Sequence, residues 1–250
     1  METLLALESV TVRGRDQPRL RQVSLTVRPG ERVALLGASG AGKSTLLSVA
    51  NGLIRPDAGQ VLWNGAPPAR SRRARQRQQY RVGTLWQDLR LIEELSVQQN
   101  LNTAGLAHWS WPRVWLNLLL PLETEHNAAA LAQVDLEAAL LPRAVAELSG
   151  GQRQRVAIAR LLRQEAQLWL LDEPLASLDP RRAREILALL LRHGQAPRGL
   201  LLSLHRPDLL AGFDRVIGLR HGELCVDLPL AALEPSHLET LYGGTPSGAG

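Results

Sequence analysis

The chain has 250 residues, and 45% of them are hydrophobic, which suffices to bury the core of one large domain or two small ones. A net charge of +5 is too small to indicate a nucleic-acid partner, and we expect none. The single cysteine, Cys225, excludes an internal disulfide framework and suits a reducing compartment.

No segment has the pattern of a secretory signal or of a membrane-spanning helix. The first ten residues lack a basic start followed by a long apolar stretch, and no run reaches about 18 apolar residues. The most apolar segment, 111–122, contains Arg113 and Asn117 and is too short to span a bilayer. The most basic segment, 69–81, is interpreted as a solvated helix or loop, or as a face near anionic lipid headgroups.

The first part of the chain alternates short strands with turns. ALESVTV and QVSLTV predict strands, and the alternation in VSLTV is typical of a half-buried antiparallel strand. RVALLG is apolar nearly throughout, as in a strand buried on both faces. A helix is expected over LLSVANGL, ending at Asn51 and Gly52, followed by a strand at GQVLWNG.

The pattern becomes helical from about residue 88 to residue 160, after a strand predicted at RVGTLWQ. LWLLDEP and GLLLSLH then predict buried strands on either side of an amphipathic helix at RRAREILALLLRHG. Strands that alternate with helices imply an α/β fold with a mostly parallel core sheet. We expect a single domain over 1–243, with a helical subdomain at about 88–160 and a flexible tail at 244–250.

A phosphate-binding loop is predicted between the strand VALL and the following helix. GASGAGKST matches the pattern G-x-x-x-x-G-K-[ST], in which glycines let the backbone wrap around phosphate oxygens and the helix N-terminus adds partial positive charge. Lys43, the only lysine in the chain, is expected to reach the β- and γ-phosphates, Ser44 to bind Mg²⁺, and Thr45 to contact the α-phosphate region. The nucleotide-binding residues of this loop are Gly37, Ala38, Ser39, Gly40, Ala41, Gly42, Lys43, Ser44 and Thr45.

Two adjacent carboxylates end the apolar strand in LWLLDEP. Asp172 is expected at the carboxyl edge of the sheet, where it can hold Mg²⁺ through water. Glu173 is expected to point toward the γ-phosphate and to polarise the attacking water.

A third motif, ELSGGQRQRVAIARLL, begins with a serine and two glycines before a helix, an arrangement that offers donors to an anion. This LSGGQ segment resembles the ATP-binding cassette family, the ATPase subunits of ABC transporters, and the resemblance runs from about residue 4 to residue 243. It implies a P-loop ABC ATPase with an N-terminal antiparallel β subdomain, an inserted α-helical subdomain, and ATP and Mg²⁺ as cofactors. In the family, the residues that match Ser149, Gly150, Gly151 and Gln152 complete the ATP site of a second copy, which implies a head-to-tail homodimer.

The resemblance also implies roles for three residues elsewhere in the chain. Gln87 in TLWQDLRL resembles the family glutamine that reaches Mg²⁺ and the attacking water. Asp179 in ASLD resembles an aspartate of the dimer interface, and His205 in LLLSLH resembles the histidine that bonds the γ-phosphate. The family aromatic that stacks on adenine is missing from SVTVRGRDQ, and Arg13 or Arg15 is a candidate to replace it.

The resemblance further implies integral-membrane permease subunits and, indirectly, a solute-binding protein. The chain would then lie at the cytoplasmic face of the inner membrane as a peripheral subunit. Most of the tryptophan-rich segment around 108–121 is expected in the core, with one or two tryptophans at the permease interface. The segments LIEELSVQQNL, DEPLASLDP and SLHRPDLL look most like those of phosphonate importer ATPases. The alternatives are an ABC ATPase for another cargo, such as phosphate, phosphite or an amino acid, or a DNA-repair type of ABC ATPase.

Overall fold

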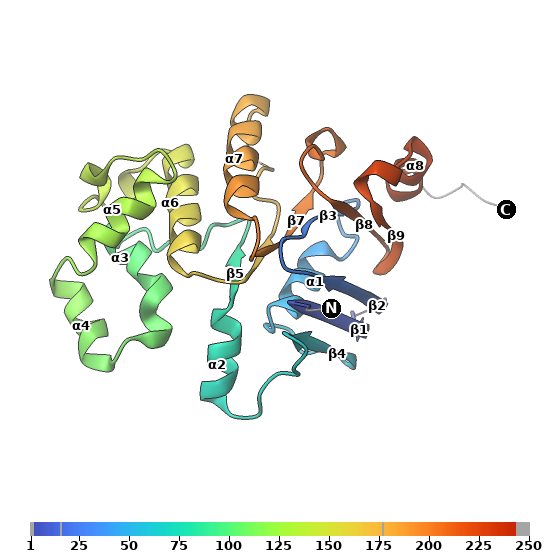
Figure 1. Cartoon of the computed structure of the whole chain (residues 1–250), viewed down its shortest axis with the longest axis horizontal. Coiled ribbons are helices and arrows are strands. Elements are labelled where there is room, and N and C mark those ends of the chain that lie inside the picture. Colours follow the sequence, from blue (N-terminus) through green and yellow to red (C-terminus); the bar gives the residue numbers. More distant parts are fainter. Residues whose placement is uncertain (1–2, 16, 177, 244–250) are drawn as a thin grey trace.

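The structure, a computed structural model, describes residues 3–15, 17–176 and 178–243. Its centre is a six-stranded sheet in the order β5-β6-β7-β3-β8-β9 (Figure 1), in which β9 alone is antiparallel to its neighbour. The strands are β3 (Arg32–Leu36), β5 (Val82–Leu85), β6 (Leu168–Leu171), β7 (Gly199–Leu204), β8 (Arg215–Arg220) and β9 (Glu223–Pro229). All residues of β6 and β7 are buried, which explains why these strands are apolar runs without alternation.

A second, three-stranded antiparallel sheet packs beside the first, in the order β2-β1-β4. Its strands are β1 (Leu5–Val12), β2 (Leu20–Val27) and β4 (Ala58–Trp63). Leu7 of β1 pairs with Leu25 on one side and with Val61 on the other, and these residues share a core with helix α1 (Lys43–Ala50). The predicted change from an antiparallel β subdomain to a parallel core is confirmed.

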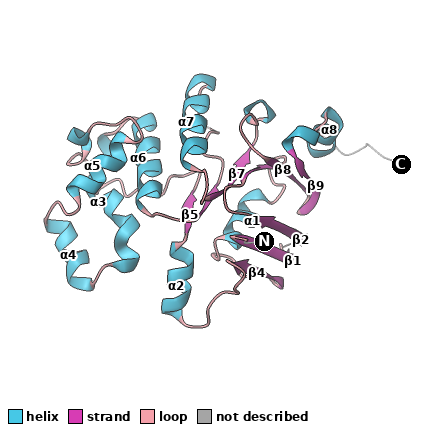
Figure 2. Cartoon of the chain, viewed as in Figure 1, coloured by secondary structure: helices cyan, strands magenta, loops and turns pink. Residues whose placement is uncertain are grey.

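The helical region lies at the end of the molecule away from the three-stranded sheet (Figure 2). It contains α3 (Val97–Asn102), α4 (Trp111–Leu119), α5 (Thr124–Ala132) and α6 (Gly150–Arg163), with 3₁₀-helices between α3 and α4 and between α5 and α6. Leu101, Leu131 and Ile158 bring α3, α5 and α6 together in a core that continues onto the parallel sheet. The tail predicted at 244–250 lies outside the described residues.

Three further helices complete the fold: α2 (Arg72–Tyr80), α7 (Pro180–His193) and α8 (Pro235–Tyr242). The arginine-rich segment is therefore helical and solvated, with no buried residue in α2. The hairpin of β8 and β9 and the helix α8 were not among the predicted elements. Within the described residues, no helix combines the length and the apolar character needed to cross a bilayer.

The tryptophan-rich segment contradicts its prediction. Trp111 is 78% exposed and Trp115 is 66% exposed, whereas the polar Asn117 of α4 is buried. The expectation that most of this segment lies in the core was wrong, because α4 turns its polar side inward.

Candidate functional site

The loop between β3 and α1 is shaped by glycines in conformations that other residues rarely adopt. Gly42, the N-cap of α1, has a φ of 108°, and Gly40 has a φ of 79°. A Cβ atom at Gly42 would lie 2.7 Å from the carbonyl oxygen of Arg19, and one at Gly37 would lie 2.3 Å from that of Leu219. Only glycine fits these two positions, so the loop can wrap closely at the helix N-terminus, where anions bind.

Lys43 is almost fully buried, and its ammonium group is bonded to three acceptors. The Nζ atom donates to the carbonyl oxygens of Gly37 at 2.8 Å and Ala38 at 3.2 Å, and it lies 3.3 Å from Oε1 of Glu173. An ammonium has three donors, so this arrangement saturates the group. A guanidinium carries five donors in a rigid planar fork and does not match three acceptors in so narrow a space.

Glu173 joins the phosphate loop to strand β7. Its Oε1 atom lies 2.5 Å from Nε2 of His205, just past β7, as well as 3.3 Å from Lys43 Nζ. Glu173 has a φ of 49°, and this left-handed backbone turns its side chain away from the course of β6. The structure thus brings together three side chains that the sequence separates by 130 and 32 residues.

Ser203, which was not among the predicted site residues, forms hydrogen bonds with both Asp172 and Glu173. Its fully buried Oγ atom donates to Oδ1 of Asp172 at 3.0 Å and accepts a bond from the backbone N–H of Glu173 at 2.8 Å. A lone hydroxyl in the otherwise apolar strand GLLLSL is the signal that could have identified it, since a buried hydroxyl needs partners.

A cavity of about 730 Å³ opens over the phosphate loop. Predicted residues that line it are Ser39, Gly40, Gly42, Lys43, Ser44, Thr45, Gln87, Glu173 and His205. The unpredicted Gln17, Pro18, Arg19, Ala176, His221 and Gly222 line it as well. Neither Arg13 nor Arg15 is among the lining residues, so Arg19 and His221 are better placed than either to contact a base at the cavity wall.

The predicted residues of LSGGQ line a different cavity, of about 530 Å³. Ser149 is the N-cap of α6 and forms a capping box with Gln152, in which each side chain bonds the backbone N–H of the other. Gln87 and Glu173 line both this cavity and the one over the phosphate loop. Among the described residues, none of LSGGQ lines the cavity over the phosphate loop, and none of the phosphate loop lines the cavity beside LSGGQ.

Helix α6 also holds the loop that follows Gln87. The guanidinium of Arg160 donates to the carbonyl oxygens of Leu89 and Arg90, both at 2.6 Å. Burial lowers the pKa of Arg160, and the two carbonyl bonds offset part of the cost of burying its charge.

Asp179 lines neither cavity. Its side chain caps α7 by accepting hydrogen bonds from the backbone N–H groups of Arg181 and Arg182.

The sequence matches the family described as ABC transporter over residues 20–176. The chain belongs to the ABC transporter family. Curated relatives include the phosphonates import ATP-binding protein PhnC 1 of Pseudomonas syringae pv. tomato, 42% identical over 89% of this chain and 85% of the relative. PhnC of Pseudomonas putida is 43% identical, over 89% of this chain and 84% of its own.

Solved structures of ABC proteins share the fold. The cbiO1 protein of Clostridium perfringens, part of an ABC transporter complex, has a TM-score of 0.75 and 27% identity, over 92% of this chain and 89% of that one. A dimeric ATP-binding cassette bound to ADP and phosphate has a TM-score of 0.76 and 25% identity, over 92% and 100%. The predicted ABC ATPase fold and family are confirmed.

The ABC site has the donor set that a magnesium ion requires. Mg²⁺ prefers oxygen ligands, and the exposed Ser44 hydroxyl, the Gln87 side chain and the Asp172 carboxylate supply them. Ser44 and Gln87 line the same cavity, and Asp172 precedes the lining residue Glu173. Among the residues described, no cluster of three or more histidine, cysteine or acidic side chains could hold a metal by itself, so water and nucleotide oxygens would complete the shell.

Proposed function

We propose that the chain is the ATP-hydrolysing subunit of an ABC importer for phosphonate or a related oxyanion. The ATPase part rests on one observation: Oε1 of Glu173 lies against both Lys43 and His205 in the cavity over the phosphate loop. The cargo rests on the phosphonate import proteins that are 42% and 43% identical to most of this chain.

The reaction begins when the γ-phosphate of ATP replaces the Glu173 carboxylate as the anion beside Lys43. Its ammonium faces the Glu173 carboxylate, and the γ-phosphate of ATP is a stronger, multiply charged competitor for the same cation. Released from Lys43, the carboxylate can accept a proton from the attacking water, while its contact with His205 keeps it oriented. The His205 side chain lines the same cavity, so its ring lies where it can contact the γ-phosphate.

The remaining phosphate charge is balanced by the backbone and by a bound cation. The glycine-rich loop and the N-terminus of α1 offer donors to the phosphates. Ser44, Gln87 and Asp172 are the residues that would hold Mg²⁺, which neutralises developing charge when it is present. Ser203 positions Asp172 and Glu173 relative to each other through its two hydrogen bonds.

Two copies are needed to bring LSGGQ to a nucleotide. Within one chain, Ser149 and Gly151 line a cavity that is separate from the phosphate loop, so a second copy packed head to tail would supply them. We infer that Ser149, Gly150, Gly151 and Gln152 contact the nucleotide of the partner copy. Asp179, as the exposed cap of α7, would lie near the interface between the copies.

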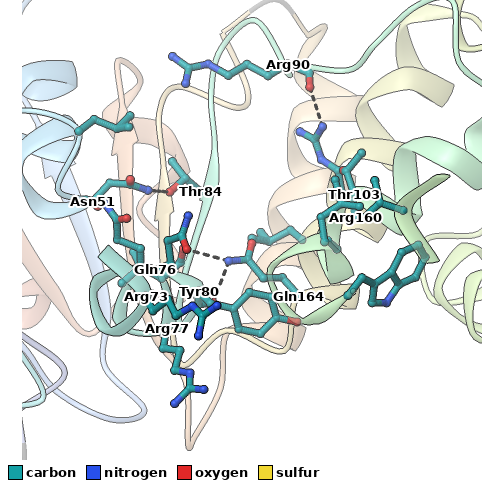
Figure 3. Close-up of a pocket in the computed structure, with 18 of the residues that line it drawn as sticks. Asn51, Arg73, Gln76, Arg77, Tyr80, Thr84, Arg90, Thr103, Arg160 and Gln164 are labelled. Carbon is teal, nitrogen blue, oxygen red and sulfur yellow. Dashed lines mark hydrogen bonds between the residues drawn. The ribbon is translucent and has the colours of Figure 1, made fainter. Parts of the chain in front are cut away.

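A groove between α2 and the helical region is the proposed docking site for the permease (Figure 3). Its lining includes the cations Arg73, Arg77, Arg90 and Arg160 and the aromatic side chains of Tyr80 and of three tryptophans. None of the described residues that line it is a carboxylate. Such a groove suits a short amphipathic segment with acidic residues. Docked there, the chain would be peripheral at the cytoplasmic face, and a solute-binding protein would contact only the permease.

The variant Glu173→Gln tests the ATPase assignment. The amide keeps the size of the side chain but cannot accept the proton, so ATP turnover is expected to fall by about 10²-fold or more, while an ATP-bound dimer accumulates in size-exclusion chromatography. Glu239→Gln, on the exposed side of α8, is the matched control and should leave both measurements unchanged. Turnover near the wild-type rate in Glu173→Gln would contradict the assigned base.

The cargo is tested with the assembled transporter. Co-purification from the native membrane identifies the permease and the solute-binding protein, and the ATPase rate is then measured with each candidate anion. Stimulation by phosphonate supports the proposal, whereas stimulation by phosphate, phosphite or an amino acid alone would assign a different cargo to the same ATPase.

A further inference from the structure

Helix α4 is fixed in its rotation by a buried polar chain of hydrogen bonds. Oδ1 of Asn117 accepts from Asn102 at 2.6 Å, Oδ1 of Asn102 accepts from Asn127 at 2.7 Å, and Oδ1 of Asn127 accepts from Arg163 at 2.9 Å. All three asparagines are buried. Rotating α4 would break the bond between Asn102 and the buried Asn117, and an unsatisfied buried group costs about 1–3 kcal/mol, so the inward side of the helix is determined.

The opposite side of α4 is apolar and exposed. Trp111, Trp115 and Leu119 recur every four residues and are 78%, 66% and 82% exposed, so they form one stripe along the helix. Leu116 and Leu120 widen the stripe. Scattered exposed apolar residues are ordinary, but a contiguous patch with two tryptophans marks an interaction surface.

The charge beside this stripe is positive. Helix α2 faces α4 across the groove, and Arg73 and Arg77 of α2 line the same groove as Trp111 (Figure 1 shows both helices at the lower edge). Over the described residues, the four arginines of α2 form no ion pair with a carboxylate, and neither α2 nor α4 contains an acidic residue. The surface therefore combines apolar aromatics with cations that the protein itself leaves unneutralised.

We propose that α4 and α2 form a surface that rests directly on an anionic lipid bilayer, apart from any contact with the permease. Tryptophan rings favour the headgroup level of a bilayer, and arginines beside them are attracted by anionic headgroups. The nine residues of α4 are about 13 Å long, so the helix lies on the roughly 30 Å hydrocarbon layer and does not span it. Trp115 and Leu119 lie outside the residues that line the permease groove, which favours a lipid over a permease segment as their partner.

Flotation of the purified full chain with lipid vesicles tests this surface without a permease. The wild-type protein should float with vesicles of phosphatidylcholine and phosphatidylglycerol, float less with phosphatidylcholine alone, and detach as salt is raised. The double variant Trp115→Glu, Leu119→Glu, at two exposed residues outside the permease groove, should lose flotation, whereas Ile92→Glu, a charge at another exposed apolar residue, should not. The double variant Arg72→Gln, Arg75→Gln, at exposed arginines of α2 that do not line the groove, should weaken binding about fivefold or more for each arginine, and Arg181→Gln with Arg184→Gln on the distant α7 should not.

The outcomes separate a lipid surface from the alternatives. Because the substituted side chains are exposed, thermal unfolding and basal ATP turnover of the variants should match the wild type, which shows that the fold is intact. Absence of wild-type flotation on anionic vesicles would overturn the proposal. It would also be overturned if the variant Trp115→Glu, Leu119→Glu floated normally but failed to assemble with the permease, since the stripe would then be a protein interface.

Discussion

Removal of the Ser203 hydroxyl tests how the two acidic residues are positioned. Ser203→Ala deletes the donor to Oδ1 of Asp172, 3.0 Å away, and the acceptor for the backbone N–H of Glu173, 2.8 Å away. Ser203 is fully buried and Asp172 is 6% exposed, so water has little access to replace either bond. Both groups would therefore lose a partner without compensation.

The expected cost follows from the two lost bonds. A hydrogen bond to a charged group is worth about 1.5–3 kcal/mol, and a buried N–H left unsatisfied costs about 1–3 kcal/mol. Allowing for partial relaxation, we expect the free energy of unfolding to fall by about 2–4 kcal/mol and the melting temperature by roughly 5–15 °C. Because Glu173 would move relative to the attacking water, kcat should fall by about 10- to 100-fold.

The assay separates positioning from a general loss of stability. Steady-state ATP turnover should show a lower kcat with little change in KM for ATP, since Ser203 makes no bond to Lys43 or the phosphate loop. Ser203→Thr keeps the hydroxyl and suits a strand, so it should restore much of kcat even if its extra methyl lowers stability. A Ser203→Ala variant with wild-type kcat would refute the reasoning.

Three further predictions concern other charged residues: Lys43, Arg160 and Asp214. Lys43→Arg should lower ATP turnover by about 10²-fold despite the conserved charge, because the buried site offers three acceptors to an ammonium; phosphate release measures this, and near-normal turnover would contradict it. Arg160→Gln should lower the free energy of unfolding by about 2–4 kcal/mol, measured by urea denaturation, because two carbonyls lose a charged donor; an unchanged value would disprove that role. The guanidinium of Arg32 holds the pKa of Asp214 below its usual 3.8, so the pair stabilises the fold above about pH 3.8 and this contribution is lost as the pH falls through the lowered value. Asp214→Asn should therefore show a smaller acid-induced loss of stability than the wild type between neutral pH and pH values below about 3.8; an equal loss in both proteins would count against the pair.

The sequence by itself determined the parts of the site that are local. GASGAGKST specifies a loop whose glycines tolerate positive φ, and the apolar strands before it and before Asp172 specify where a parallel sheet presents its carboxyl edge. These features depend on neighbouring residues, so the pattern was sufficient for the phosphate loop, the ABC family and the fold class. The β8–β9 hairpin is not predictable in this way, because its turn at His221 and Gly222 lacks the Asn-Gly or Asp-Gly pair that usually signals a tight hairpin.

Tertiary structure alone decided which distant groups meet and which face of a helix is covered. The contacts of Glu173 with Lys43 and His205, and the hold of Ser203 on both carboxylate-bearing residues, depend on the sheet order β6-β7-β3, which periodicity does not specify. Hydrophobicity predicted a buried α4, but the asparagine chain through Asn117 turned its tryptophans outward. An apolar stripe shows only that one side of a helix avoids water. Because buried polar groups need hydrogen-bond partners, their positions decide whether that stripe packs inside the protein or faces outward.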